Sequence, residues 1–332
     1  MEAAGRLLRR ATRSLVAGGA PNPLLALLGP TRRRACREVL LEVEPRARAL
    51  HPDLARGDAG ARASLAQLAD AALAEMRRRV TRDASISGQS ARWAASADDW
   101  WRRTDELEHL DDPTLDPAVR VRIVTHLDAM NELLGSYRHF FERLRPMLEP
   151  GRPTRVLDLA SGHGGFALAL ARASRDQSIP LEVVASDIKP EYLALGAARA
   201  REEGLALRTS VQDALDLSNL RRGDFDVVTC TQALHHFNPG RIAVMFAEAS
   251  RIASRGVLFI DGTRNALTAA TTWMIGRLGF RDREFAHDSL VSFRRFFVPE
   301  ELELLGRLTP SGERARAATV APGHCVLELP AG

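Results

Sequence analysis

Short apolar runs alternate with amphipathic stretches between residues 155 and 261, and this alternation restricts the fold more than any other feature of the chain. The runs near 155–160, 181–186, 206–211, 225–230 and 256–261 are predicted strands. The stretches near 165–175, 190–203 and 239–253 are predicted helices, as is a later one near 299–307, and two last strands are expected near 314–320 and 324–329. Strands separated by helices form a mostly parallel sheet with helices on both faces, so the predicted class is α/β.

The first 148 residues contain no convincing strand. Ala, Leu and Arg recur there with helical spacing, and five prolines are predicted to interrupt the helices: Pro21, Pro23, Pro30, Pro45 and Pro52. A broad apolar stripe over 117–148 predicts a helix or helix pair packed on a larger body. The predicted domains are a helical N-terminal extension, 1–115, and a second domain, 116–332, with an irregular insertion at about 263–296.

Composition excludes several classes of protein. The 332 residues suffice for about two folding units. No run of about 18 apolar residues is present, which excludes an integral membrane protein. Residues 1–50 hold ten Arg and four Glu, so the basic charge is local, and Arg32 to Arg34 are expected on a solvated helix face. The three cysteines lie far apart, which indicates a reducing compartment, and we predict a cytoplasmic protein.

One predicted strand, turn and helix form a cradle for a cofactor. The strand carries Asp158, and Gly162 and Gly164 lead into the following helix. Glycines allow the backbone to pass close to a ligand, and open α/β sheets bind ligands at this edge. Gly162-x-Gly164-x-x-Ala167 also satisfies the dinucleotide fingerprint, so a nicotinamide or flavin enzyme is a second interpretation.

Polar residues follow the next three predicted strands. Asp187 ends the second, 23 residues after Gly164, where a carboxylate can accept both hydroxyls of a ribose. Gln212 and Asp213 follow the third, where an adenine amino group could bind. The fourth runs into Thr231-Gln232-Ala233-Leu234-His235-His236-Phe237.

In order and spacing these four blocks resemble the class I S-adenosylmethionine-dependent methyltransferases. The Leu-His-His-Phe ending resembles their small-molecule branch, related to quinone and natural-product methyltransferases. The resemblance covers residues 118–329 and implies a Rossmann-like, seven-stranded methyltransferase sheet behind an all-helical N-terminal extension. It also implies S-adenosylmethionine as cofactor and S-adenosylhomocysteine as product. The departure from the pattern is His163, where many members carry a small residue.

The resemblance implies a cofactor site along the carboxyl edge of the sheet. Asp158 and the 160–164 backbone would hold the methionine group, Asp187 the ribose, and residues 212–214 the adenine. The residues after the fourth strand would close over the sulfonium. The cofactor-binding residues predicted in this way are Asp158, Ala160, Ser161, Gly162, Gly164, Asp187, Ile188, Gln212, Asp213, Ala214, Thr231, Gln232 and His236.

The expected chemistry asks little of the side chains. A sulfonium is already a strong electrophile, so the protein has to align the acceptor and exclude water. A hydroxyl acceptor would benefit from a general base, and the candidates at this edge are His235, Asp261 and His287. No metal is predicted, because no close group of Asp, His, Glu and Cys in the sequence requires one.

The acceptor pocket is expected between the helical N-terminal part and the insertion. Aromatic residues would line it, and arginines could receive an anionic group. The alternative is that these aromatics form the insertion's own small core and the arginines stay in water. The predicted substrate residues are Tyr137, Arg264, Trp273, Met274, Arg294 and Phe296.

The predicted function is methyl transfer to a small organic metabolite in bacterial secondary metabolism, with oxygen ahead of carbon as the acceptor atom. The alternatives are a C-methyltransferase, a peptide or RNA methyltransferase, and a non-catalytic scaffold with the same fold. The fourth-strand motif is not the Asn/Asp-Pro-Pro-Tyr/Phe type, which argues against nucleic acid as acceptor. The helical extension also offers a surface for a homodimer.

Overall fold

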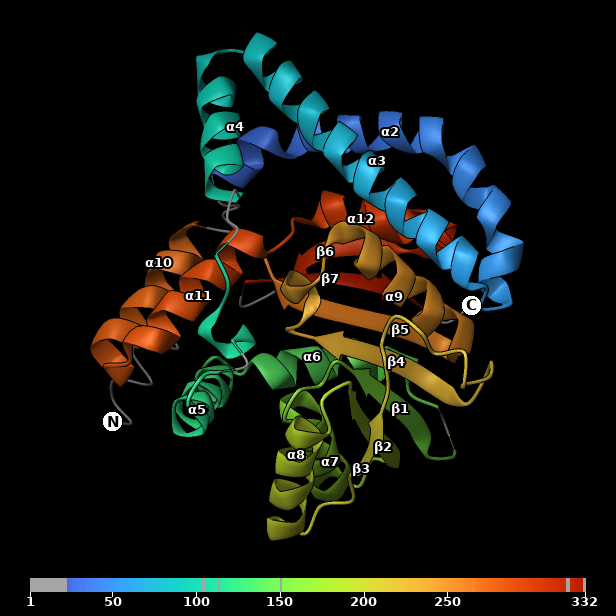
Figure 1. Cartoon of the computed structure of the whole chain (residues 1–332), viewed down its shortest axis with the longest axis vertical. Helices are drawn as coiled ribbons and strands as arrows, with labels where there is room; N and C mark the ends of the chain where they lie inside the picture. Colours follow the sequence, from blue (N-terminus) through green and yellow to red (C-terminus); the bar gives the residue numbers. More distant parts are fainter. Residues whose placement is uncertain are drawn as a thin grey trace.

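The computed structural model describes residues 23–102, 106–112, 114–149, 151–264, 266–320 and 323–330. Pro21 and the rest of the first 22 residues therefore lie outside the described part of the chain. Figure 1 shows a twisted sheet with helices on both faces and a pair of long N-terminal helices packed beyond one of these helical layers.

The N-terminal part is helical, as predicted. Asp58 caps the second long helix by accepting a hydrogen bond from the Ala61 amide, and Asp116 caps a later helix at Ala118. Gly135, with φ 67°, separates the last two α-helices, because glycine adopts the left-handed conformation without strain. The elements are α2 (Pro23–Ala55), α3 (Ala59–Ile86), α4 (Gln89–Arg102), η1 (His109–Asp111), α5 (Pro117–Leu134), α6 (Ser136–Leu144) and η2 (Arg145–Met147).

The sheet has the predicted seven strands, in the order β3-β2-β1-β4-β5-β7-β6. The first five are parallel, and β7 runs antiparallel to both β5 and β6. Because β1 and β4 are central neighbours, the residues that follow them meet at one edge. The strands are β1 (Thr154–Leu159), β2 (Leu181–Asp187), β3 (Arg208–Val211), β4 (Phe225–Thr231), β5 (Ala253–Gly262), β6 (Arg316–Val320) and β7 (His324–Leu329).

Helices cover both faces of the sheet, as the alternation predicted. The predicted helix bounds agree closely with α7 (Gly165–Gln177), α8 (Pro190–Glu202), α9 (Pro239–Ile252) and α12 (Pro299–Arg307). The short helices η3 (Leu234–His236) and η5 (Gly312–Arg314) complete this part. Alternate residues of each strand point to opposite faces, so Leu157 packs with α3, α9 and α12, whereas Val156 packs with α6 and α7.

The N-terminal helices share one hydrophobic core with the sheet. Val39 from α2 and Leu65 from α3 belong to the same buried cluster as Phe246 from α9 and Phe259 from β5. Figure 1 shows α9 and α12 between the α2–α3 pair and the sheet. The extension is therefore packed into the body of the fold. Its predicted boundary at residue 115 stays a prediction.

Two expectations about local structure were wrong. Pro30, Pro45 and Pro52 lie inside α2, which continues through all three, because a long packed helix can bend to accommodate the lost hydrogen bond and the ring clash at each proline. The insertion predicted to be irregular is helical, with α10 (Ala266–Met274), the π-helix η4 (Ile275–Phe280) and α11 (Arg283–Arg295). Phe293 of α11 packs against Ala269 of α10, a contact between distant positions that local periodicity does not reveal.

No helix in the described residues combines the length and hydrophobicity that a membrane crossing demands.

Candidate active site

Asp158 lies near the end of β1, fully buried under the loop that follows. Its Oδ1 accepts a hydrogen bond of 2.7 Å from the Thr229 hydroxyl of the neighbouring strand β4. Burial raises the pKa of Asp158 to about 7, the hydrogen bond from Thr229 opposes this rise, and the nearby charge of Asp187 adds to it. Asp158 thus links the two central strands below the loop.

The loop from 160 to 164 turns sharply back on itself. Ala160, Gly162 and Gly164 have φ values of 47°, 55° and 80°, all in the left-handed region that favours glycine. Ser161 donates its amide to the Ser186 carbonyl of β2 at 2.9 Å, which ties the loop to the next strand. The loop is therefore a tight turn fixed beside the end of β2.

Asp187 connects this loop to the ends of β2 and β3. Its Oδ2 accepts from the Gly162 amide and its Oδ1 from the Lys189 amide, both at 2.9 Å. The Gln212 amide donates to the Asp187 carbonyl at 3.1 Å, so the block after β3 lies next to the predicted ribose position. Three of the four sequence blocks are brought together here.

The side chains after β3, which were expected to hold the adenine, are engaged with nearby residues of the protein. The exposed Asp213 accepts from the Leu215 amide at 2.9 Å, so it caps its own turn. The Gln212 side-chain amide bonds to Ser210 and Asn219, whereas Ala214 is buried. One oxygen of the Asp213 carboxylate therefore stabilises its own turn.

The fourth block meets α5 above the sheet. Gln232 follows Thr231 with φ 55° and exchanges two hydrogen bonds of 2.9 Å with the buried Asn131. Its backbone amide donates to the Ile260 carbonyl at 2.7 Å. A strained residue held by paired amides is typical of a functional site rather than of a simple turn.

Asp128, also on α5, is the centre of a second polar group beside the loop. Its Oδ1 accepts from the Tyr137 hydroxyl and contacts His163 Nε2, both at 3.1 Å, and its Oδ2 accepts from Arg199 at 2.5 Å. Burial would raise the pKa of Asp128, but His163 and Arg199 lower it to about 2. The Asp128 carboxylate therefore holds the His163 ring in place through Nε2.

His235 and Asp261, two of the three candidate bases, are in contact with each other. His235 Nδ1 lies 2.8 Å from Asp261 Oδ2, which also accepts the His235 amide at 2.8 Å. On the other side of the ring, Nε2 lies 3.4 Å from Glu108 Oε1. Burial would lower the pKa of His235, but the two carboxylates raise it to about 9. The structure therefore places the His235 ring between two buried acids at the end of β4, which favours the protonated form of the ring.

Comparison with known proteins agrees with this geometry. The family profile described as "Methyltransferase domain" matches residues 156–256, the segment that carries all four blocks. Residues 156–256 form a class I S-adenosylmethionine-dependent methyltransferase domain.

The relatives of this methyltransferase domain include quinone-modifying enzymes. A ubiquinone biosynthesis O-methyltransferase of Xanthomonas axonopodis pv. citri is 33% identical over 129 residues, which are 39% of this chain and 50% of that protein. A demethylmenaquinone methyltransferase of Thermus thermophilus is 33% identical over 117 residues, 35% of this chain and 51% of that protein. The chain spans about half the length of these curated relatives.

Solved structures that resemble the chain include the S-adenosylmethionine-dependent methyltransferase SibL in its apo form. The TM-score is 0.47 at 18% identity, over 70% of this chain and 64% of that one. The PH0226 protein of Pyrococcus horikoshii OT3 has a TM-score of 0.42 at 20% identity, over 59% of this chain and 92% of that one.

S-adenosylmethionine is the cofactor of this class of domain, and the loop is suited to hold it. The Ser161 hydroxyl is buried without a hydrogen-bond partner among the described residues, so a polar ligand group could complete it. A Cβ on Gly162 would meet nothing within 4 Å, so the loop borders open space. Directly after Asp187, Ile188 leaves 61% of its surface exposed, where an apolar ring could cover it.

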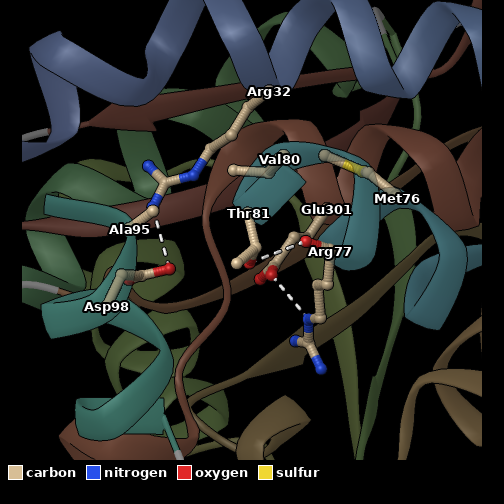
Figure 2. A pocket seen from close by; sticks show the side chains of 8 residues that line it. All are labelled: Arg32, Met76, Arg77, Val80, Thr81, Ala95, Asp98 and Glu301. Atoms are coloured by element: carbon tan, nitrogen blue, oxygen red, sulfur yellow. Dashed lines mark hydrogen bonds and ion pairs between the residues drawn. The ribbon is translucent and has the colours of Figure 1, made fainter. Parts of the chain in front are cut away.

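Arg264 was predicted to receive an anionic group of the acceptor, but its guanidinium is not available to a ligand in this structure. It is 3% exposed, and its guanidinium donates to Asp98, Glu301 and the Phe296 carbonyl. Arg32 is also buried and pairs with Asp98 at 3.1 Å, so its predicted place on a solvated face was wrong. Figure 2 shows Asp98 facing Arg32 and Glu301 facing Arg77 in a small pocket between the N-terminal helices and α12. The guanidinium groups of Arg32 and Arg264 therefore form ion pairs within the fold.

The other predicted substrate residues are spread over the site and the insertion. Phe296 packs its ring edge-on to His235, with centroids 4.9 Å apart, and so reaches the candidate base. The Tyr137 hydroxyl is committed to Asp128 and Asn131, so it helps to build the cofactor side rather than an acceptor pocket. Trp273 and Met274 on α10 are 42% and 48% exposed.

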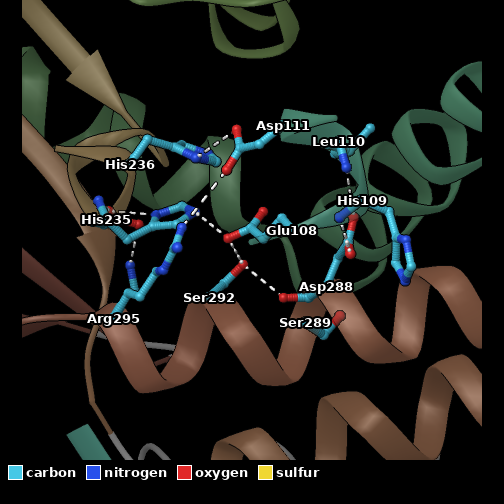
Figure 3. A network of polar contacts seen from close by, with 12 residues as sticks. Glu108, His109, Leu110, Asp111, His235, His236, Asp288, Ser289, Ser292 and Arg295 are labelled. Atoms are coloured by element: carbon cyan, nitrogen blue, oxygen red, sulfur yellow. Dashed lines mark hydrogen bonds and ion pairs between the residues drawn. The ribbon is translucent and has the colours of Figure 1, made fainter. Parts of the chain in front are cut away.

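The other two predicted histidines, His236 and His287, and Arg294 contact residues 106–111 or α11. His236 pairs with Asp111 at 3.3 Å, close to the candidate base, whereas His287 contacts Glu106 and Asp288, away from it. Arg294 lies 3.7 Å from Glu106. Figure 3 shows His235, His236, Glu108 and Asp111 gathered in one polar network.

Two groups of histidines and carboxylates come close enough to share a cation, which the sequence alone did not predict. One is formed by Glu108, His235 and His236, and the other by His109, His287 and Asp288, with ligand atoms within 4.8 Å of one another in each. In the first group His235 is also bound to the buried Asp261 and is the candidate base, so this group belongs to the candidate active site.

Sequence reasoning missed three residues that complete the site: Asp128, Asn131 and Glu108. Asp128 and Asn131 are polar positions three apart on the largely apolar stripe of α5, and this spacing was a usable signal. Glu108 stands in the acidic run Asp105-Glu106-Leu107-Glu108, in which nothing distinguishes the one carboxylate that becomes buried beside His235.

Proposed function

We propose that the chain transfers the methyl group of S-adenosylmethionine to an oxygen of a small hydroxylated aromatic or quinol-type metabolite. The observation that carries this proposal is the buried His235–Asp261 pair at the ends of β4 and β5, since β4 is the neighbour of the strand β1 that leads into the cofactor loop. The relatives named for ubiquinone biosynthesis are O-methyltransferases, which supports oxygen and the quinol class. The demethylmenaquinone methyltransferase relative supports the same quinone-type class of acceptor, and carbon is the second candidate acceptor atom.

The bound cofactor supplies an electrophilic methyl group, and the residues of the chain position the acceptor and accept its proton. Asp261 accepts from Nδ1 of His235 and from its amide, which fixes the ring with Nε2 turned toward the segment 106–111. Nε2 is the atom that can accept the hydroxyl proton, because Nδ1 is already engaged. Glu108 lies 3.4 Å from Nε2 in this structure, so it has to move aside for the acceptor hydroxyl to reach that atom.

Phe296 and the segment 106–111 would keep water from this point. Phe296 covers one edge of His235, and Ser292 of α11 donates to Glu108 at 2.7 Å, which holds the segment in place. Exclusion of water favours transfer to the acceptor over loss of the methyl group to solvent. Secondary metabolism, the cytoplasmic location and the homodimer stay predictions.

Cofactor binding is tested by titration with S-adenosylhomocysteine, with NADH as the control ligand. Asp187→Ala should weaken binding of S-adenosylhomocysteine by about 1–3 kcal/mol, because it removes charge-assisted hydrogen bonds to the ribose. Asp176→Ala, which removes an exposed carboxylate at the end of α7, is the matched control and should bind normally. Equal affinity of the two variants would contradict the ribose assignment, and binding of NADH alone would contradict the proposed function.

The pH dependence of the reaction reports on the candidate base. Since the two carboxylates raise the pKa of His235 to about 9, kcat/KM for a phenolic acceptor should rise with pH through that region as the ring loses its proton. Glu108→Gln removes one of the two negative charges and keeps an oxygen that can accept from Ser292. The rise of kcat/KM should therefore occur at lower pH in this variant. If kcat/KM rises at the same pH in Glu108→Gln as in the parent chain, the assignment of His235 as the titrating base is contradicted.

A further inference from the structure

A second histidine–carboxylate cluster lies outside the candidate active site, where residues 106–110 pack on α11. The His109 and His287 rings lie with their centroids 4.2 Å apart at an interplanar angle of 56°. One ligand atom each from His109, His287 and Asp288 lie within 4.8 Å of one another. Figure 3 shows His109 beside the Asp288 carboxylate at this contact.

Backbone amides hold the Asp288 carboxylate of this cluster in place. Asp288 Oδ1 accepts from the His109 amide at 2.7 Å and Oδ2 from the Leu110 amide at 3.1 Å, which fixes the buried carboxylate relative to His109. His287 precedes Asp288 on the same helix, and its Nδ1 lies 3.1 Å from Oδ1. Glu106 places a further oxygen 2.8 Å from His287 Nε2 on the solvent side.

The protein satisfies this arrangement only in part. Both nitrogens of His287 face carboxylates, those of Asp288 and Glu106. Among the residues that the structure describes, none forms a hydrogen bond with the His109 ring, although it touches a second imidazole and a buried carboxylate. Two protonated imidazoles at this distance would repel each other, whereas two neutral ones offer lone pairs to one cation. Two imidazole nitrogens and one or two carboxylate oxygens are a ligand set that zinc and similar first-row ions prefer.

We propose that His109, His287 and Asp288, with Glu106 at the rim, bind a divalent cation of the zinc type. The ion links the segment that carries Glu108 to helix α11, so it holds the cover over His235 in place without taking part in methyl transfer. This inference does not depend on the proposed function, because the ligands lie outside the cofactor loop and the His235–Asp261 pair.

The test is calorimetric titration of the full, tag-free chain with Zn²⁺ after chelator treatment, together with the visible absorption of Co²⁺ as a readout of ligation. We expect one ion per chain and an affinity lowered by at least about ten-fold in His287→Ala and in His109→Asn. His126→Ala is the matched control, since His126 also joins the N-terminal part to the insertion through an aspartate, Asp282, at 3.0 Å. It should bind Zn²⁺ like the parent chain.

Other outcomes would overturn the site. Absence of Zn²⁺ binding in the folded parent chain, or unchanged affinity in both His287→Ala and His109→Asn, contradicts it. Binding that is lost in His236→Ala and kept in His287→Ala would assign the ion to the network around His235. Thermal unfolding of each variant shows whether a lost affinity reflects a lost ligand or a lost fold, and His109→Asn is the milder change. Binding of S-adenosylhomocysteine, measured in parallel, tests the proposed function separately.

Discussion

Replacing Arg264 by leucine is expected to lower the free energy of unfolding by about 3–5 kcal/mol, because it leaves buried carboxylates without their counter-charge. Arg264 donates to Glu301 at 3.1 and 3.2 Å and to Asp98 at 3.0 Å. Glu301 is buried in the first turn of α12, and Arg264 is the largest of the influences that lower its pKa against the effect of burial. Without that guanidinium, Glu301 must remain charged with Arg77 alone or take up a proton.

The measurement is urea-induced unfolding followed by circular dichroism. Arg175→Leu is the matched control, since it removes an arginine paired with Asp176 on the surface and should leave the unfolding midpoint nearly unchanged. The loss in Arg264→Leu should also grow from mildly acidic to neutral pH, because protonation of the stranded carboxylates relieves the penalty at low pH. A loss as small as that of Arg175→Leu would show that the network adds little to stability.

Replacing His235 by glutamine is expected to lower kcat for a phenolic acceptor by roughly 100- to 10,000-fold, the usual contribution of a general base. Glutamine can still donate to Asp261, so the buried carboxylate keeps a partner and the fold should remain. Affinity for S-adenosylhomocysteine should stay close to that of the parent chain, because the cofactor loop is anchored by Asp187 and not by His235.

Steady-state kinetics and cofactor titration of the same preparations separate these effects. His51→Gln is the control, since His51 contacts the Leu308 carbonyl far from the cofactor edge. A kcat reduced less than about ten-fold in His235→Gln would be incompatible with the base and would favour an acceptor that reacts without proton removal. A parallel fall in cofactor affinity would instead assign the ring to binding.

Local patterns predicted the larger part of the fold. The period of the apolar residues distinguished strands from helices, and the predicted strand positions match the observed sheet closely, although β5 begins at Ala253 rather than near 256. The spacing of Gly162 and Gly164 and the acid that ends β2 located the cofactor edge, because neighbouring parallel strands necessarily bring their ends together. These signals lie within short segments, so the sequence displays them directly.

The fate of individual charged side chains could not be predicted in the same way. Arg32, Arg33 and Arg34 are identical neighbours in the sequence, yet Arg32 is buried against Asp98 while the other two are largely exposed. Burial of an arginine depends on whether carboxylates from other elements surround it, and that is a property of packing.

The sequence by itself determined the α/β architecture, the helical character of the N-terminal part and the position of the methyltransferase edge, because repetition and spacing along the chain encode them. Only the tertiary structure decided that Glu108 faces His235, that Arg264 is sealed between Asp98 and Glu301, and that His109 meets His287 and Asp288. Each of these contacts joins segments that are far apart in the sequence, and their energies depend on burial and distance, which exist only once the helical extension has packed on the sheet.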